Sequence, residues 1–142
     1  MTPRQAALVK QSFMRVFPAK AKLTVAFYER LFALAPDVRP MFSDDMRTQR
    51  EMLGNTLAYM VKHLDKLDEA SETAAILAKR HVRYGVEPHH FAVVGMALLQ
   101  ALQDCTPAGL TEAETGAWTA AFETLSDLMI KAAWPEGQDM AS

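Results

Sequence analysis

Apolar side chains recur every three or four residues along most of the chain, which is the spacing of an amphipathic α-helix. The first such stretch opens at Thr2, three residues before Gln5 as in a capping box, and runs until Pro18. The same spacing predicts further helices at about 20–34, 46–64 and 71–84, one from 88 to the loop at 106–109, and one at 111–134, with a short helix or turn at 36–42. No segment alternates apolar and polar residues as a strand does. The pattern predicts an all-α protein with six main helices and one or two short ones.

The apolar faces of these helices also predict which residues form the core. The first two helices should bury one face each, formed by Val9, Phe13, Val16 and Phe17, and by Leu23, Phe27, Leu31 and Leu34. Tyr28 lies beside the second of these faces. Gln49 heads an otherwise apolar stripe, which continues through Leu53, Thr56, Leu57 and Met60. A polar side chain at the start of such an apolar helix face is a candidate for binding a ligand.

One histidine stands on a predicted apolar face. His81 follows Leu77 by four residues and Ala74 by seven, so the three share one side of their helix. A lone histidine on such a face is more often a core or surface residue whose hydrogen bonds are satisfied than a metal ligand. Tyr28, Phe42 and Gln49 also turn inward, however, and together with His81 they indicate a buried site for a flat metal cofactor, with His81 bound to the metal.

The other three histidines lack such a setting. His63 lies among Lys62, Asp65 and Lys66, where we expect it to be solvated. His89 and His90 follow Pro88 at the start of a predicted helix, and we expect both at the surface or at the rim of the site.

Composition narrows the class of protein. The 142 residues predict a single domain over residues 1–142, long enough to enclose a ligand. Half of them are hydrophobic, and the net charge of −2 favours neither nucleic acid nor an anionic membrane as a partner. The only cysteine, Cys105, cannot form an internal disulfide, which favours a reducing compartment. The N-terminus lacks the apolar core of a signal peptide and the apolar run 91–102 is too short to span a bilayer, so we expect a cytoplasmic protein.

Several segments, in order along the chain, resemble the single-domain bacterial haemoglobins of the Vitreoscilla type, relatives of the globin part of flavohaemoglobins. They are residues 27–32, 36–42, 49–51, 81, 85–86, 93–95 and 117–118, and the resemblance extends over nearly the whole chain. It implies the globin fold, a three-over-three helical sandwich around haem b. It also implies dioxygen as a ligand, with nitric oxide and carbon monoxide as further candidates.

The resemblance carries over roles residue by residue. His81 would be the proximal ligand of the haem iron, and Phe42 would pack flat against the haem. Tyr28 and Gln49 would be the polar residues of the distal pocket, where each can donate a hydrogen bond to a bound gas. The remaining candidates for contact with the haem are Leu53 and Leu57 on the distal side, Leu77, Val86, Phe91 and Val94 on the proximal side, and Arg80 beside a propionate.

The chain departs from the flavohaemoglobin pattern behind His81. In that family a Tyr and a Glu support the proximal histidine, but alignment places Phe91 and Ala133 at these positions. Glu136 lies beyond Pro135 and is not expected to substitute for the Glu. We therefore expect the N–H of His81 to be donated to a backbone carbonyl, that of Leu77. The chain also ends at Ser142 without a flavin or NAD domain, and both departures favour a ligand-binding protein over a dedicated enzyme.

Three functions remain open at this point. The first is reversible binding of dioxygen for storage, transport or sensing. The second is a nitric oxide dioxygenase served by a separate flavin reductase. The third is a haem-free helical interaction or sensor module, against which the presence of His81, Phe42 and Tyr28 argues. The sequence leaves open whether the protein is a monomer or a homodimer.

Overall fold

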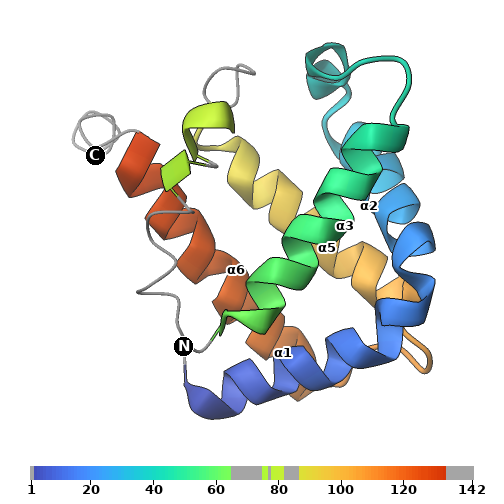
Figure 1. The fold of residues 1–142 in the computed structure, drawn as a ribbon, viewed down its shortest axis with the longest axis vertical. Coiled ribbons are helices and arrows are strands. Elements are labelled where there is room, and N and C mark those ends of the chain that lie inside the picture. Colours follow the sequence, from blue (N-terminus) through green and yellow to red (C-terminus); the bar gives the residue numbers. More distant parts are fainter. Residues whose placement is uncertain (1, 65–74, 77, 82–86, 134–142) are drawn as a thin grey trace.

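The computed structural model describes residues 2–64, 75–76, 78–81 and 87–133 (Figure 1). The helices are α1 (Pro3–Val16), α2 (Lys20–Leu34), α3 (Arg47–Lys62), α5 (His90–Cys105) and α6 (Glu112–Ala133), with the 3₁₀ helices η1 (Phe17–Ala19) and η2 (Pro36–Met41). Residues 75–76 and 78–81 are helical as well, and no strand occurs within the described residues. The predicted all-α class is confirmed. No helix in this part of the chain is long and apolar enough to cross a membrane.

Local sequence signals account for most of these boundaries. The capping box at the start of α1 is present: the Gln5 amide N–H donates to the Thr2 hydroxyl at 3.1 Å, and the Thr2 N–H donates to the Gln5 side chain at 2.9 Å. Some boundaries differ from the prediction, and α3 ends at Lys62 rather than at about 64. Pro18 lies inside η1 rather than at the end of α1, and α5 begins at His90 because Pro88 is part of the preceding turn.

Two residues of the predicted core stripes are exposed. Phe17 is 49% exposed and Leu34 is 42% exposed, so their assignment to the core was wrong. Phe17 comes directly after the last residue of α1, where the tighter 3₁₀ turn rotates it off the buried face. Its ring meets the edge of Phe13 at a centroid distance of 5.8 Å, and the Lys20 ammonium lies 5.2 Å from its centroid. Leu34 is the last residue of α2.

The helices pack in pairs around the core. α2 runs against α5 and α1 against α6, and α3 contacts both α2 and α1. In Figure 1, α3 (green) crosses in front of α5 (yellow to orange), and α1 (blue) runs along the bottom of the molecule. A second, smaller cluster of buried apolar side chains joins Ala78, Phe91 and Met129. This arrangement brings residue 81 and the start of α5 close to the end of α6.

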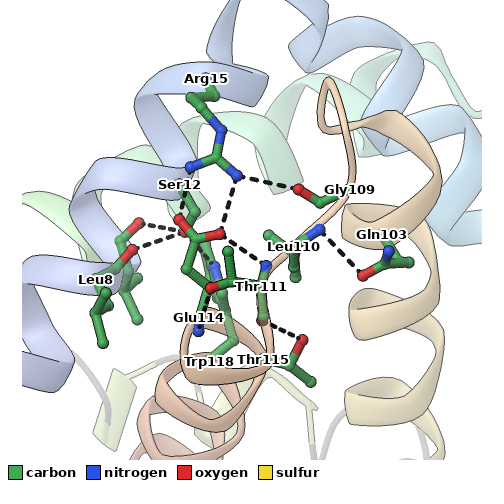
Figure 2. Close-up of polar contacts among 11 residues, drawn as sticks. Leu8, Ser12, Arg15, Gln103, Gly109, Leu110, Thr111, Glu114, Thr115 and Trp118 are labelled. Carbon is green, nitrogen blue, oxygen red and sulfur yellow. Dashed lines mark hydrogen bonds and ion pairs between the residues drawn. The ribbon is translucent and has the colours of Figure 1, made fainter.

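Polar contacts join α1 to the start of α6 (Figure 2). The Glu114 carboxylate, 1% exposed, accepts from both terminal nitrogens of Arg15 at 2.6 and 3.0 Å. Glu114 also accepts the Thr111 amide N–H at 2.9 Å, and its own N–H donates to the Thr111 hydroxyl, as the capping-box spacing predicts. The Arg15 guanidinium lowers the pKa of the Glu114 carboxyl to about 2.

A second contact lies beside the first. The indole N–H of Trp118 donates to the hydroxyl of Ser12 at 2.8 Å, and both residues are buried. The Ser12 hydroxyl in turn donates back to α1 through carbonyls of the preceding turn. We refer to Ser12, Arg15, Glu114 and Trp118 as the α1–α6 clamp. It joins α1 to the start of α6, and none of its four residues was predicted to form the site.

Candidate functional site

A cavity of about 440 Å³ lies within the bundle. Residues of α1, α2, η2, α3, α5 and α6 line it, together with Arg80 and His81. Most of its walls are apolar, with a small number of polar side chains among them. Volume and lining are those of a cofactor or ligand site, since such sites measure roughly 300–1,000 Å³ and carry few, well-placed polar groups.

Tyr28 and Gln49 form the one hydrogen-bonded side-chain pair among the described residues that line the cavity. Tyr28 projects from α2 and is 6% exposed, while Gln49 projects from the first turn of α3 and is half-buried. The Gln49 amide nitrogen donates to the Tyr28 hydroxyl oxygen at 2.9 Å. Because that oxygen is the acceptor, the hydroxyl hydrogen of Tyr28 remains to be donated to another group.

Burial determines the charge state of Tyr28. Loss of water around the hydroxyl raises the pKa of Tyr28 above its ordinary value, and the hydrogen bond from Gln49 opposes this rise only in part. The residue is therefore a neutral hydrogen-bond donor at physiological pH. A phenol in an apolar cavity suits a ligand that accepts a hydrogen bond.

Phe42 belongs to an aromatic group beside this pair. Its ring lies 5.6 Å from that of Tyr28 and 5.4 Å from that of Phe32, with interplanar angles of 72° and 68°. Arg39 fixes the backbone that carries Phe42, because its guanidinium donates to the carbonyls of Phe42 and Ser43 while lying 5.0 Å from the Phe32 ring. The sequence places Phe42 just after the 3₁₀ helix η2, and the structure orients it toward the cavity.

His81 lies on the helical segment 78–81 and is half-buried where it lines the cavity. Its imidazole ring is 6.2 Å from the ring of Phe91 on α5, with an interplanar angle of 34°. Phe91 belongs to the smaller apolar cluster, against which Ala133 at the end of α6 also packs. The two residues at which the chain departs from the flavohaemoglobin pattern thus both belong to this apolar region.

Nearly all the residues predicted from the sequence meet at this cavity. Its lining includes Tyr28, Phe42, Gln49, Leu53, Leu57, Arg80, His81, Phe91 and Val94. Leu77, Val86 and Glu136 lie outside the described residues, as does the predicted acceptor of the His81 N–H. The structure brings together side chains from widely separated segments, and their individual roles stay predictions.

His90 differs from its prediction. It was expected at the surface or rim, but it is 8% exposed and lines the cavity. The reason is the later start of α5: His90 is the first residue of the helix, next to the inward-facing Phe91. The neighbouring His89 has a side chain 67% exposed, as expected. His63 is half-buried, stacks on Tyr59 and does not line the cavity.

Within the described residues, no group of three or more His, Cys, Asp and Glu side chains could hold a bare metal ion. His81 is a single imidazole facing an apolar cavity, a donor set that suits a metal already held by a macrocycle. Haem iron is such a metal, because the porphyrin supplies four nitrogens and the protein needs to supply only an axial ligand. The aromatic rings near the cavity are equally suited to a flat apolar ring system.

The sequence pattern of the Globin family matches residues 25–129. The chain belongs to the globin family. It is similar to a protein named flavohemoprotein from Burkholderia sp. (strain TH2), with 30% identity over 128 residues that make up 87% of this chain and 33% of the relative. The globin thus spans about a third of the length of the flavohemoproteins that it matches.

Solved structures agree on the fold. A bacterial globin from Campylobacter jejuni superimposes with a TM-score of 0.83 at 24% identity, covering 96% of this chain and 99% of that one. Ferric Aplysia limacina myoglobin gives a TM-score of 0.82 at 23% identity, covering 94% and 99%. The predicted globin fold is confirmed, and so is the resemblance to flavohaemoglobins. As a globin, the protein has haem with its iron as cofactor, which the cavity fits in volume, apolarity and ligand chemistry.

Proposed function

We propose that this globin binds dioxygen reversibly, with His81 as the residue that would bind the haem iron and the Tyr28–Gln49 pair as the gas-binding polar group. The observation that carries the proposal is the direction of the hydrogen bond between Gln49 and Tyr28. It leaves the Tyr28 hydroxyl hydrogen available inside an apolar cavity that His81 also lines. When bound, haem iron would supply a coordination position for a diatomic gas.

The chain's own residues would do three things in this function. His81 would hold the cofactor, while Phe42 and the leucines 53 and 57 would exclude water from the cavity. Tyr28 would offer its hydroxyl hydrogen to a gas that accepts a hydrogen bond. Gln49 orients the phenol by donating to its oxygen, and Arg80, an exposed residue of the cavity lining, would pair with a carboxylate of the cofactor.

Replacement of Tyr28 by Phe tests the proposal. The ring and its packing stay, but the donor is lost, so the dissociation rate of dioxygen from the ferrous protein should rise about 10- to 100-fold, as expected for a hydrogen bond to a charged acceptor. Stopped-flow displacement by carbon monoxide measures this rate. Tyr59→Phe, on the exposed side of α3, is the matched control and should leave the rate unchanged. An unaltered rate in Tyr28→Phe would refute the role given to Tyr28.

The assignment of His81 has its own test. His81→Ala should lose the visible absorption spectrum of a histidine-ligated haem, whereas His63→Ala, outside the cavity, should keep it. Added imidazole should restore the spectrum of the His81→Ala protein by filling the space of the missing side chain. A wild-type spectrum in His81→Ala without imidazole would show that another residue binds the iron.

Nitric oxide dioxygenase activity is the second candidate function. It is favoured by the similarity to flavohemoproteins, of which this chain matches only about a third. Nitric oxide and dioxygen would combine with one electron to form nitrate, so a separate flavin reductase would have to supply that electron in each turnover. The test is multiple turnover of nitric oxide with a reductase and NADH present. Consumption limited to one equivalent would leave gas binding alone.

A further inference from the structure

His90 is an imidazole of the cavity to which the proposed function gives no role. Its side chain is buried and lines the cavity, as do those of Tyr28 and Trp118, whose hydrogen-bond partners are given above. A buried polar side chain in an apolar wall is costly unless its hydrogen bonds are satisfied. Its partners therefore indicate what it does.

His90 forms a closed pair of hydrogen bonds with Glu87. The Glu87 amide N–H donates to the imidazole Nδ1 of His90 at 2.9 Å, and the His90 amide N–H donates to the Glu87 carbonyl at 3.0 Å. His89, the residue that precedes α5, contributes no side-chain cap. The His90 ring thus acts as a cap for α5, because it accepts a hydrogen bond from the backbone that leads into this helix.

The hydrogen bonds between His90 and Glu87 determine the tautomer and the orientation of the His90 ring. Since Nδ1 accepts a hydrogen bond from a backbone amide, the proton of the neutral imidazole is on Nε2. The ring then has one tautomer and one orientation, and it cannot rotate without leaving the Glu87 amide unpaired. Burial against the cavity restricts it further.

The residue that follows, Phe91, contacts the proposed iron ligand. The Phe91 N–H donates to the Pro88 carbonyl at 3.2 Å, within the turn that His90 closes. Its ring, 7% exposed, lies 6.2 Å from the ring of His81. The place of the Phe91 ring therefore depends on the turn, and the turn depends on the His90–Glu87 pair.

We infer that His90 is a positioning residue for His81: it closes the turn at the start of α5 and so holds the ring of Phe91 against the imidazole that binds the iron. This rests on the proposed function in so far as His81 is taken as the ligand. The physical reason is that residues around a ligating imidazole orient its ring and thereby tune the metal–nitrogen bond.

The experiment compares three variants of the haem-loaded protein. His90→Leu keeps bulk but removes the acceptor, and His90→Asn offers an amide oxygen at the position of Nδ1. His63→Leu alters a histidine that does not line the cavity and serves as the control. The readouts are the iron–histidine stretching band of the ferrous, gas-free protein in resonance Raman spectra and the rate of haem loss to excess apomyoglobin.

We expect His90→Leu to shift and broaden the band and to speed haem loss about 5-fold, the factor that corresponds to one hydrogen bond of ordinary strength. His90→Asn should restore both values, and His63→Leu should match the wild type. A wild-type band in His90→Leu overturns the inference, and so does an Asn variant that behaves like the Leu variant.

Phe91→Leu provides a second test of the inference, because it leaves the His90–Glu87 pair in place. It should shift the same band, and an unchanged band overturns the inference even where His90→Leu fails to fold. His81→Ala separates this inference from the proposed function. Loss of the band in His81→Ala with no effect at His90 refutes the positioning role alone, whereas a band retained in His81→Ala refutes the assignment of His81.

Discussion

Two regions of this globin use polar side chains in opposite ways. In the α1–α6 clamp, Glu114 and the indole N–H of Trp118 are each paired with a residue of α1 about a hundred positions away in the sequence. In the cavity, Gln49 and Tyr28 pair with each other and the phenol keeps a hydrogen to donate. Satisfied polar groups thus stabilise the contact between two helices, whereas the donor with remaining capacity faces the proposed ligand.

The largest effect on stability should come from Glu114→Ala. It removes the charge-assisted bonds from Arg15 and the bond that the Thr111 N–H donates to the Glu114 carboxylate, and together these should cost about 3 kcal/mol of unfolding free energy. Urea unfolding of the haem-loaded protein measures the loss. Glu112→Ala, exposed in the same first turn of α6, is the matched control. Equal losses in both variants would mean that the clamp adds nothing beyond the helix dipole.

Ser12→Ala should follow, with a loss of about 2 kcal/mol, because it leaves the buried indole N–H of Trp118 without an acceptor. The same substitution in a Trp118→Phe background should cost much less, since the orphaned donor is then gone. This double-mutant cycle isolates the bond from the packing. If Ser12→Ala costs the same in both backgrounds, the hydrogen bond has no part in stability.

The α1–α6 clamp should also make the free energy of unfolding depend on pH. The pKa of Glu114 is about 2 in the folded protein and near its ordinary 4.5 when unfolded, so its contribution is complete above pH 4.5 and is lost as the pH falls toward 2. Arg15 is partly in solvent, and screening limits this contribution to about 1–2 kcal/mol. Urea midpoints between pH 5 and pH 3 should fall less steeply in Glu114→Gln than in the wild type; parallel curves would assign the acid sensitivity to other carboxyls.

The smallest change in stability should come from the cavity. Gln49→Leu removes a hydrogen bond but adds apolar surface at a half-buried position, so the unfolding free energy should change by less than about 1 kcal/mol. The dissociation rate of dioxygen should nevertheless rise, because the phenol of Tyr28 loses the group that orients it. Gln100→Leu on α5, outside the cavity lining, should leave the rate unchanged. A large loss of stability in Gln49→Leu would contradict the contrast between the two regions.

Features that depend on near neighbours were predictable. The bounds of α2 and both capping boxes follow from residues three or four positions apart, and the structure confirms them. The convergence of Tyr28, Phe42, Gln49 and His81 came from resemblance to a family whose packing is known. Phe17 and His90 were misplaced because a shift of a helix end by one or two residues turns a side chain from one face to another.

The sequence by itself determined the helices, their caps and most of their buried faces, because these depend on hydrogen bonds and periodicity within a few residues. Only the tertiary structure decided that Arg15 meets Glu114, that Gln49 donates to Tyr28 and that His90 lies in the cavity wall. Such pairings depend on how whole helices pack, and a rotation of one helix by a single residue would break them. The sequence indicated the family and the cofactor, and packing decided how polar groups are arranged around that cofactor.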